Sequence, residues 1–387
     1  MDWLPHMNKD FRNIETPFYY YDTALLKATL DAICSEIEQY PNFHIHYALK
    51  ANANPKLLPL ILQAGFGADC VSGGEIDAAI NAGFAPEQIV FAGVGKSDKE
   101  ILLGLRNDIL CFNVESVPEL QVINELASKE GRVANVCVRI NPDIEAHTHK
   151  NIRTGLAENK FGIAWSEMIE VVKLANTMPN IHFKGLHFHI GSQITDMDDF
   201  RGLCLRINEL QDQLEMNGWQ AEMINVGGGL GIDYSQPQQH AIPDFHAYFQ
   251  TYATYLKLRP EQSVHFELGR SIVGQCGTLI TRVLYVKQGL NRQFAIVDAG
   301  MTDLIRPALY HAQHTVENIS SVANSYEQYD VVGPICESSD VFGENVQLPV
   351  TQRNDIIAIR SVGAYGETMA SCYNCRQLPR SYTDQEI

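Results

Sequence analysis

Short apolar runs alternate with helix-length segments along roughly the first two thirds of the chain. Eight such runs have the length and composition of strands, at 43–50, 67–71, 89–92, 109–114, 133–140, 182–190, 222–226 and 263–268. Most neighbouring runs leave room for a helix between them, and residues 55–62 and 166–174 have helical patterning. Strands alternating with helices over about 250 residues predict an α/β fold, a parallel (β/α)8 TIM barrel.

The pattern changes after residue 270, where strand-like runs follow one another with little helical signal. They lie at 279–286, 294–297, 329–332 and 356–360, and they predict a C-terminal β-rich domain of sandwich or barrel type. Residues 17–21 are also strand-like and precede a helix whose N-cap is expected at Asp22 or Thr23. The predicted barrel domain spans 22–262, with its last strand running on to about 270, and residues 1–21 plus 271–387 form the second domain.

The composition is that of an enzyme large enough for two hydrophobic cores, since 45% of the 387 residues are hydrophobic. The formal net charge of −17, without a basic stripe, argues against a nucleic-acid or anionic-membrane partner. No basic segment followed by an apolar one opens the chain, and no run approaches the ~18 apolar residues of a membrane-spanning helix. Nine cysteines, an odd number, are expected to be reduced thiols in the cytoplasm.

Lys50 closes the first apolar run, so its amine is expected where a buried strand meets a loop. Desolvation there disfavours the charged amine and leaves it able to form a Schiff base. For a single lysine at a strand end, a side chain that simply extends into solvent is the commoner explanation. The choice between that and a Schiff-base lysine therefore depends on other residues. Strand ends share one face of a barrel, and that face carries the active site. Polar residues and glycines gather at those ends: Asp69, Arg139, Asn141, His187, His189, Gly227 to Gly229, Glu267 and Arg270.

The glycine triplet at 227–229 follows the seventh run, in the part of a barrel that most often binds phosphate. Glycines let backbone N–H groups approach a phosphate closely, although a tight turn without a ligand explains the triplet equally well. Ser192, Gly269 and Arg270 could complete the cradle. An amine together with a phosphate site suggests pyridoxal 5'-phosphate, and Glu267 would then face the pyridine nitrogen and keep it protonated.

Six short motifs are spread over nearly the whole chain. They are YALKAN at 47–52, VSGGE at 71–75, HFHIGSQ at 187–193, NVGGG at 225–229, DAGM at 298–301 and GPICES at 333–338. Together they resemble the fold-type III decarboxylases that depend on pyridoxal phosphate, and the match runs from 17–19 to 373–374. The resemblance implies decarboxylation of meso-2,6-diaminopimelate at its D-centre, giving L-lysine and carbon dioxide. It also implies a homodimer in which the 336–337 loop reaches the Lys50 site of the other chain.

The resemblance assigns roles around the cofactor. Lys50 would form the Schiff base, His189 would stack on the ring, and Glu267 would pair with the ring nitrogen. The other residues that would contact the cofactor are Asp69, Ser192, Gly227, Gly228, Gly229, Gly269, Arg270 and Tyr365.

The resemblance also assigns the substrate contacts. Cys336 would protonate the α-carbon after carbon dioxide leaves, and Glu337 would bind the distal ammonium group. A planar guanidinium suits a carboxylate, and a tyrosine adds a neutral donor. The residues that would bind the distal head are Arg270, Arg306 and Tyr310, with Tyr365 touching both cofactor and substrate.

Two positions depart from the usual family pattern. Leu268 stands where proline is common, and it keeps the neighbouring side chains in place. Ser339 stands where glycine is common, which puts the local loop conformation in question because glycine adopts positive φ more easily.

No metal site is expected. His187 and His189 alternate on a predicted strand and so point the same way, but no third ligand has convincing spacing. Cys372 and Cys375 have CxxC spacing without a second pair, so surface or packing cysteines are the better interpretation.

Three alternative functions remain open. A related decarboxylase would act on ornithine, arginine or carboxynorspermidine, but these lack a distal amino acid head, so Arg306 and Glu337 count against it. A non-catalytic homologue would bind and regulate an enzyme partner, and the presence of Lys50, Glu267 and Cys336 counts against that. An amino-acid racemase would need a second catalytic base, and no residue is assigned to that role.

Overall fold

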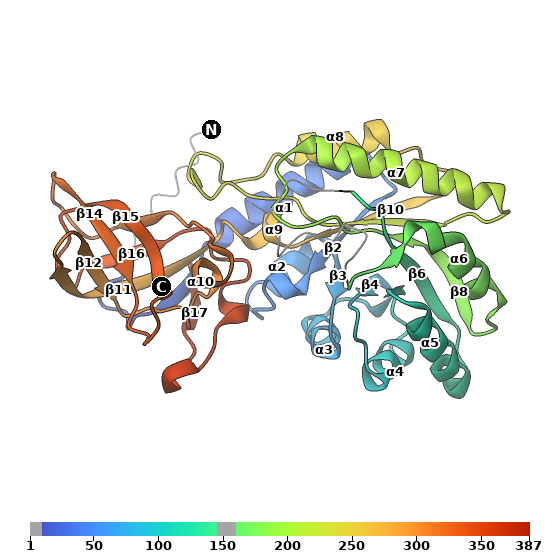
Figure 1. The fold of residues 1–387 in the computed structure, drawn as a ribbon, viewed down its shortest axis with the longest axis horizontal. Coiled ribbons are helices and arrows are strands. Elements are labelled where there is room, and N and C mark those ends of the chain that lie inside the picture. The colour runs from blue at the N-terminus through green and yellow to red at the C-terminus, as the bar shows by residue number, and fades with distance from the viewer. Residues whose placement is uncertain (1–9, 145–159) are drawn as a thin grey trace. The chain divides into compact units, whose positions relative to one another are not determined.

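The computed structural model describes residues 10–144 and 160–387, which form two compact units (Figure 1). The barrel unit comprises Leu30–Gly231 and Asp244–Gly269. The β-rich unit comprises the chain up to Thr29, Ile232–Pro243 and Arg270–Ile387. Within the described residues, no helix is both long and apolar enough to cross a bilayer.

The barrel unit is built on parallel strands that close on themselves, so the predicted TIM barrel is confirmed. The strands are β2 (Phe43–Ala48), β3 (Gly67–Cys70), β4 (Ile89–Phe91), β5 (Cys111–Val114), β6 (Ala134–Asn141), β8 (Ile181–His187), β9 (Met223–Gly227) and β10 (Ser263–Leu268). Each pairs in parallel with its neighbours, and the β10–β2 and β5–β6 pairings complete the ring. A short additional strand, β7 (Ile163–Ala164), pairs with β6. Every residue of the eight barrel strands is buried except His44, Asn135, His182, Lys184 and Ser263, as expected for a parallel sheet covered on both faces.

Helices follow most of these strands around the barrel (Figure 1). They are α2 (Leu58–Gln63), α3 (Gly73–Ala82), α4 (Asp98–Arg106), α5 (Val117–Glu130), α6 (Met168–Thr177), α7 (Met197–Met216) and α8 (Phe245–Tyr255). Side-chain caps fix where several begin: Ser72 accepts from the N–H of Glu75, and Ser116 accepts from that of Glu119. The βα connections therefore place strand ends and helix starts on one face of the barrel.

Two strands end earlier than their apolar runs. The first run was predicted to continue to Lys50, but β2 ends at Ala48 and Lys50 lies in a 3-10 turn, Leu49–Ala51. The run at 182–190 yields β8 only as far as His187, which lies opposite Asn225 of β9. The backbone turns at Gly227, with φ of 70°, and this ends β9. The two histidines therefore do not share a strand as predicted: His187 ends β8, and His189 lies in the loop beyond it.

The β-rich unit is a mixed, mostly antiparallel sheet. Its strands are β1 (Phe18–Tyr21), β11 (Gly277–Gln288), β12 (Gln293–Val297), β13 (Val316–Asn318), β14 (Tyr326–Val332), β15 (Val341–Pro349), β16 (Ile356–Ile359) and β17 (Arg380–Thr383). The sheet order is β13-β16-β11-β12-β14-β15, and β1 pairs with β11 and β17. The N-terminal strand belongs here because Phe18 and Tyr20 pack against Ile280 and Ile356 in one apolar cluster.

Two segments that were expected in the barrel domain, residues 22–29 and 232–243, belong to the β-rich unit instead. Hydrogen bonds explain this. The side chain of Asp22 caps α1 (Thr23–Ile37) by accepting from the N–H of Leu25, and Thr23 donates to Asp384 at 2.6 Å. In the 232–243 segment, the hydroxyl of Thr315 donates to the carbonyl oxygen of Tyr234 at 2.9 Å. Both segments are continuous in sequence with the strands and helices of the barrel, so the sequence shows no boundary there.

Candidate active site

Lys50 and Asp69 form an ion pair at the carboxyl ends of adjacent barrel strands. Ala48 of β2 lies opposite Asp69 of β3, and Lys50 Nζ is 2.8 Å from Asp69 Oδ2. Asp69 is fully buried, whereas 34% of the Lys50 side chain is exposed. Burial raises the pKa of Asp69, and Lys50 opposes that shift. The sequence argument placed this amine in apolar surroundings, and the structure corrects it: a buried carboxylate contacts the amine directly.

Glu267 lies at the centre of a buried hydrogen-bond network. Its Oε1 accepts from the side-chain amides of Asn225 at 2.7 Å and Asn113 at 3.1 Å, and its Oε2 is 3.1 Å from His187 Nε2. Burial alone would raise the pKa of Glu267, but the interactions with His187 and Lys50 outweigh burial and hold it well below its usual range. Glu267 is therefore an anion at neutral pH, which suits it to face a cationic ring nitrogen.

His189 and the glycine loop are joined by a hydrogen bond. The N–H of Gly228 donates to His189 Nδ1 at 3.2 Å, so the ring proton of the neutral imidazole is on Nε2. Burial, followed by the charge of Arg139, holds the pKa of His189 well below its ordinary value. The imidazole is therefore neutral and can stack against a flat ring.

The glycines of the 227–229 loop are required by close backbone contacts. A Cβ on Gly227 would lie 2.2 Å from the carbonyl oxygen of Phe188, and one on Gly228 would lie 1.9 Å from that of Glu267. The N–H of Gly227 donates to Asn225 Oδ1 at 2.9 Å, and that of Gly228 is bound by His189. Within the described chain, only the N–H of Gly229 in this triplet lacks such a partner, so it is the one available to an anion.

The remaining predicted cofactor residues of the barrel unit lie on the same face. Ser192 is partly exposed in the loop after β8. Gly269 follows β10, and a Cβ there would lie 3.0 Å from that of Ala51 and 3.1 Å from that of Ala48, so this junction has no room for a side chain. Leu268 continues the pairing of β10 with β2 opposite Tyr47, so the leucine at this position preserves the strand.

The β-rich unit holds a second cluster, of arginines and tyrosines. Arg306 and Tyr310 lie on the short helix α10 (Arg306–Tyr310), and Arg270 begins α9 (Arg270–Val273). The Arg306 guanidinium lies 5.9 Å from the ring centre of Tyr365 and 6.0 Å from that of Tyr310, and Arg270 lies 5.0 Å from Tyr365. Tyr234 also belongs to the cluster, because its hydroxyl accepts from Arg270 Nη1 at 2.6 Å.

Arg306 is a buried cation that has no anionic partner among residues 10–144 and 160–387. It is 5% exposed, and among the residues that the structure describes it forms no ion pair and its Nε has no hydrogen-bond partner. Burial lowers its pKa, with Arg270 acting in the same direction. An uncompensated buried charge is costly, so this cluster is suited to bind an anionic group.

The loop with Cys336 and Glu337 is exposed in the single chain. Its base is held by Asp340, whose carboxylate accepts from the N–H of Ile335 at 2.7 Å. Tyr373 donates its hydroxyl proton to Glu337 Oε1 at 2.7 Å. Ser339 is not among the positions with positive φ, so serine at this position causes no backbone strain.

Four neighbours of the predicted residues are not assigned a role by the sequence: Asn113, Asn225, Tyr234 and Tyr373. Asn113 and Asn225 lie inside strands and are identified only by their distance to Glu267. Tyr234 follows the glycine loop closely in sequence, which is the one signal that could have suggested it.

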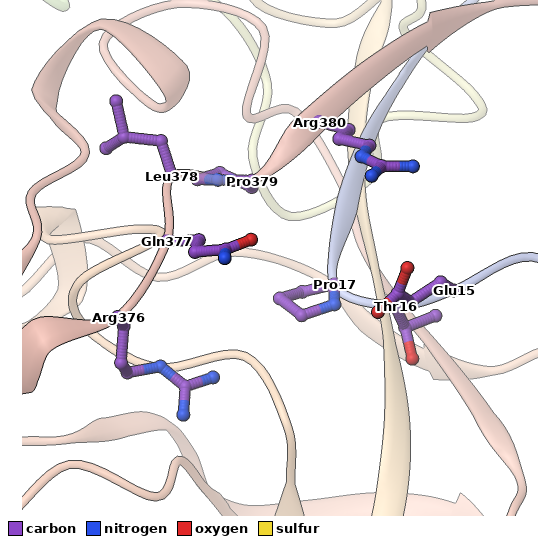
Figure 2. Close-up of a pocket in the computed structure, with 8 residues that line it drawn as sticks. All are labelled: Glu15, Thr16, Pro17, Arg376, Gln377, Leu378, Pro379 and Arg380. Carbon is purple, nitrogen blue, oxygen red and sulfur yellow. The ribbon is translucent and has the colours of Figure 1, made fainter.

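In the β-rich unit, residues 15–17 and 376–380 line a cavity of about 290 Å³, which contains none of the predicted site residues (Figure 2). In the described part of the chain, no three His, Cys, Asp or Glu side chains are arranged to hold a metal ion. Cys372 and Cys375 are exposed thiols.

Comparison with known proteins agrees with this geometry. Residues 29–274 match the family described as pyridoxal-dependent decarboxylase, pyridoxal binding domain, so the class is that of the pyridoxal-dependent decarboxylases. Diaminopimelate decarboxylase of Bacteroides thetaiotaomicron is 63% identical over 97% of both chains, and that of Helicobacter pylori is 42% identical over 95% of this chain and 89% of the relative. The chain belongs to the diaminopimelate decarboxylase family.

Solved structures give the same result. Diaminopimelate decarboxylase from Helicobacter pylori complexed with L-lysine has a TM-score of 0.90 and 41% identity, covering 96% of this chain and 92% of that one. The lysine/ornithine decarboxylase of Vibrio vulnificus complexed with putrescine has a TM-score of 0.83 at 21% identity, which shows the shared fold alone.

Proposed function

We propose that this protein decarboxylates meso-2,6-diaminopimelate to L-lysine and carbon dioxide, the last step of lysine biosynthesis. The observation that carries the choice of substrate is Arg306, a buried guanidinium enclosed by tyrosine rings and lacking a protein anion among the described residues. Diaminopimelate supplies a second carboxylate for it, whereas ornithine, arginine and lysine supply only the carboxylate that would leave. The same feature counts against a carboxynorspermidine or other basic amino-acid decarboxylase.

The cofactor is pyridoxal 5'-phosphate, and the barrel residues fit it. Lys50 would bind its aldehyde, with the buried Asp69 at 2.8 Å holding a proton of the amine. Glu267, kept anionic by its network, would face the ring nitrogen, and the neutral His189 would stack on the ring. When bound, the cofactor accepts the electron pair that the departing carboxylate leaves behind. The remaining contacts would come from Ser192, Gly227, Gly228, Gly229, Gly269, Arg270 and Tyr365.

The β-rich unit would bind the substrate's far end and deliver the proton. Arg270, Arg306 and Tyr310 provide donors for the distal carboxylate, and the Glu337 carboxylate suits the distal ammonium group. The Cys336 thiol would give its proton to the α-carbon after carbon dioxide leaves. Tyr373, which donates to Glu337, would keep that carboxylate oriented.

A homodimer with two shared sites completes this arrangement. Cys336 and Glu337 are exposed in the single chain although both would act on substrate, so a partner chain is the natural cover for them. In a two-fold dimer each chain would offer this loop to the Lys50 site of the other, which creates two equivalent sites. The enzyme would act in the cytoplasm, where nine reduced cysteines are stable.

The test is carbon dioxide release by the protein loaded with pyridoxal phosphate. Meso-diaminopimelate should be turned over, and ornithine, arginine and lysine should be slower by about 10⁴-fold, because a site built for a polar head leaves buried groups unpaired when the head is absent. Equal rates for lysine and meso-diaminopimelate would contradict the assignment of the distal site. A protein that binds the cofactor but releases no carbon dioxide from any of the four would point to the non-catalytic alternative.

A further inference from the structure

Tyr234 joins the two arginines of the β-rich unit. Its hydroxyl oxygen accepts a hydrogen bond from Arg270 Nη1 at 2.6 Å. Its ring centre lies 5.6 Å from the Arg306 guanidinium, within the range of a cation–π contact. One side chain is thus in contact with both guanidinium groups, through its oxygen on one side and its ring face on the other.

The hydrogen-bond roles leave the phenolic proton of Tyr234 available. A guanidinium can only donate, so in the bond to Arg270 the tyrosine oxygen is the acceptor. A phenol also has one O–H to donate, and within the described residues no acceptor takes it. The hydroxyl is polarised by a cationic donor, and the ring that carries it lies under Arg306, a second cation that has no anionic partner among the described residues. A ligand oxygen that approaches Arg306 would meet this O–H.

The surroundings of Tyr234 fix its ring. Thr315 donates its hydroxyl proton to the carbonyl oxygen of Tyr234 at 2.9 Å, and the His314 ring packs edge-to-face on it, with centres 5.1 Å apart. His314 is itself tied to the carbonyl oxygen of Arg360 at 2.9 Å. Burial, followed by the charge of Arg306, lowers the pKa of His314 to about 3, so the ring is neutral and adds no further positive charge. The position of the hydroxyl is therefore set before any ligand binds.

We propose that Tyr234 is a specificity-determining residue that donates a hydrogen bond to the distal carboxylate of the substrate. Its hydroxyl adds a third hydrogen-bond donor to those of Arg270 and Arg306. Three donors suit a ligand group that can only accept hydrogen bonds. A carboxylate has about four lone-pair sites and accommodates such a set, whereas an ammonium head would bring donors against donors. The inference rests on the proposed function, because it concerns the distal head of the same substrate.

The experiment compares the parent protein with Tyr234→Phe, both loaded with pyridoxal phosphate. Phenylalanine keeps the ring against Arg306 and His314 and removes only the hydroxyl. The ligands are L-lysine, whose carboxylate is the distal one of the substrate, and cadaverine, the same chain without a carboxylate. Binding is measured by calorimetry, together with kcat and KM for meso-diaminopimelate. Tyr285→Phe is the matched control. Tyr285 also lies under an arginine, Arg353 at 5.4 Å, but it is 57% exposed, belongs to β11 and contacts neither Arg270 nor Arg306 in the described structure.

The hydroxyl should account for about tenfold or more in affinity, the range of a hydrogen bond to a charged group. In Tyr234→Phe the Kd of L-lysine and the KM of meso-diaminopimelate should rise by that factor, with kcat changed less and cadaverine binding unchanged. Tyr285→Phe should match the parent throughout.

Two results overturn the inference. Unchanged Kd and KM in Tyr234→Phe would show that the hydroxyl does not contact the carboxylate. An equal loss of affinity for L-lysine and cadaverine in Tyr234→Phe would show that Tyr234 has only a structural role. A parent protein that does not decarboxylate meso-diaminopimelate at all would instead refute the proposed function, and the contrast between L-lysine and cadaverine would then decide for or against the carboxylate contact by itself.

Discussion

Acid should destabilise the barrel unit through His46. This residue is 2% exposed on β2, and its Nδ1 lies 3.0 Å from the carbonyl oxygen of Gln88 while its Nε2 lies 2.7 Å from His265 Nδ1. A carbonyl oxygen can only accept, so His46 carries its proton on Nδ1 and accepts from His265 through Nε2. Protonation of His46 would make its Nε2 a donor as well, so His265 would have to move its own proton from Nδ1 to Nε2, which lies 3.0 Å from Ser263 Oγ.

The size of the effect follows from the pKa of His46. Burial lowers it to about 4, from the ordinary value of 6.5, with the interactions with Glu267 and Gln88 opposing the shift and His44 adding to it. The folded pKa is depressed, so the unfolded chain binds the proton first and stability falls as the pH drops from about 6.5 to about 4. Linkage gives a loss of about 2 kcal/mol between pH 7.5 and pH 5 from this group alone.

The assay is thermal unfolding of the parent and of His46→Gln at pH 7.5 and pH 5. A loss of about 2 kcal/mol corresponds to about 4 to 8 °C for a domain of 150–250 residues. On going from pH 7.5 to pH 5, the melting temperature of the parent should therefore fall by about 4 to 8 °C more than that of His46→Gln. His182→Gln is the control, because His182 lies in the same unit and its side chain is 46% exposed. Its melting temperature should fall between pH 7.5 and pH 5 by as much as that of the parent. An equal fall in the parent and His46→Gln would refute the reasoning.

Three further predictions concern the site. Lys50→Ala should remain folded but lose the visible absorbance of the bound cofactor and nearly all turnover, and a cofactor bond still reducible by borohydride in that variant would refute the role of Lys50. Arg306→Met should raise the KM for meso-diaminopimelate by 100-fold or more, because breaking a buried charge pair costs on the order of 3–5 kcal/mol. Arg353→Met removes an exposed arginine that lies over Tyr285, and it should leave the KM unchanged. Lys50→Ala and Cys336→Ala should each be inactive as homodimers and recover about a quarter of the parent activity when mixed, because half the dimers are then mixed and half of their sites are intact. Verified mixed dimers with no more activity than either variant would refute the shared site.

The barrel could be predicted because parallel strands are buried on both faces and therefore appear as continuous apolar runs. Every predicted barrel strand is present, and the differences are at the ends, where Lys50 and His189 lie just beyond the last paired residue. The β-rich unit was harder. Strand β15 mixes exposed polar residues such as Glu344 and Gln347 with buried Phe342 and Leu348, and β13 has three residues, so neither produces a clear apolar run.

The site divides in the same way. Lys50, the glycine loop and Glu267 could be predicted, because reactive and small residues at strand ends have a chemical meaning of their own. The network around Glu267 could not, since Asn113 is 154 positions away along the chain and is an ordinary strand residue until the barrel closes. The ion pair of Lys50 with Asp69 was likewise hidden, because adjacent strands bring together residues that the sequence separates. Tyr234 was missed because only the fold brings it into contact with Arg270 and Arg306, which come later in the chain.

The most direct test of the central claim follows both products of one reaction. The protein, loaded with pyridoxal phosphate, is incubated with meso-diaminopimelate, and carbon dioxide and lysine are measured together with the configuration of the lysine. One lysine, of L configuration, should form for each carbon dioxide released, and the Lys50→Ala protein should form neither. Carbon dioxide without an equal amount of L-lysine, or full activity without Lys50, would contradict the account.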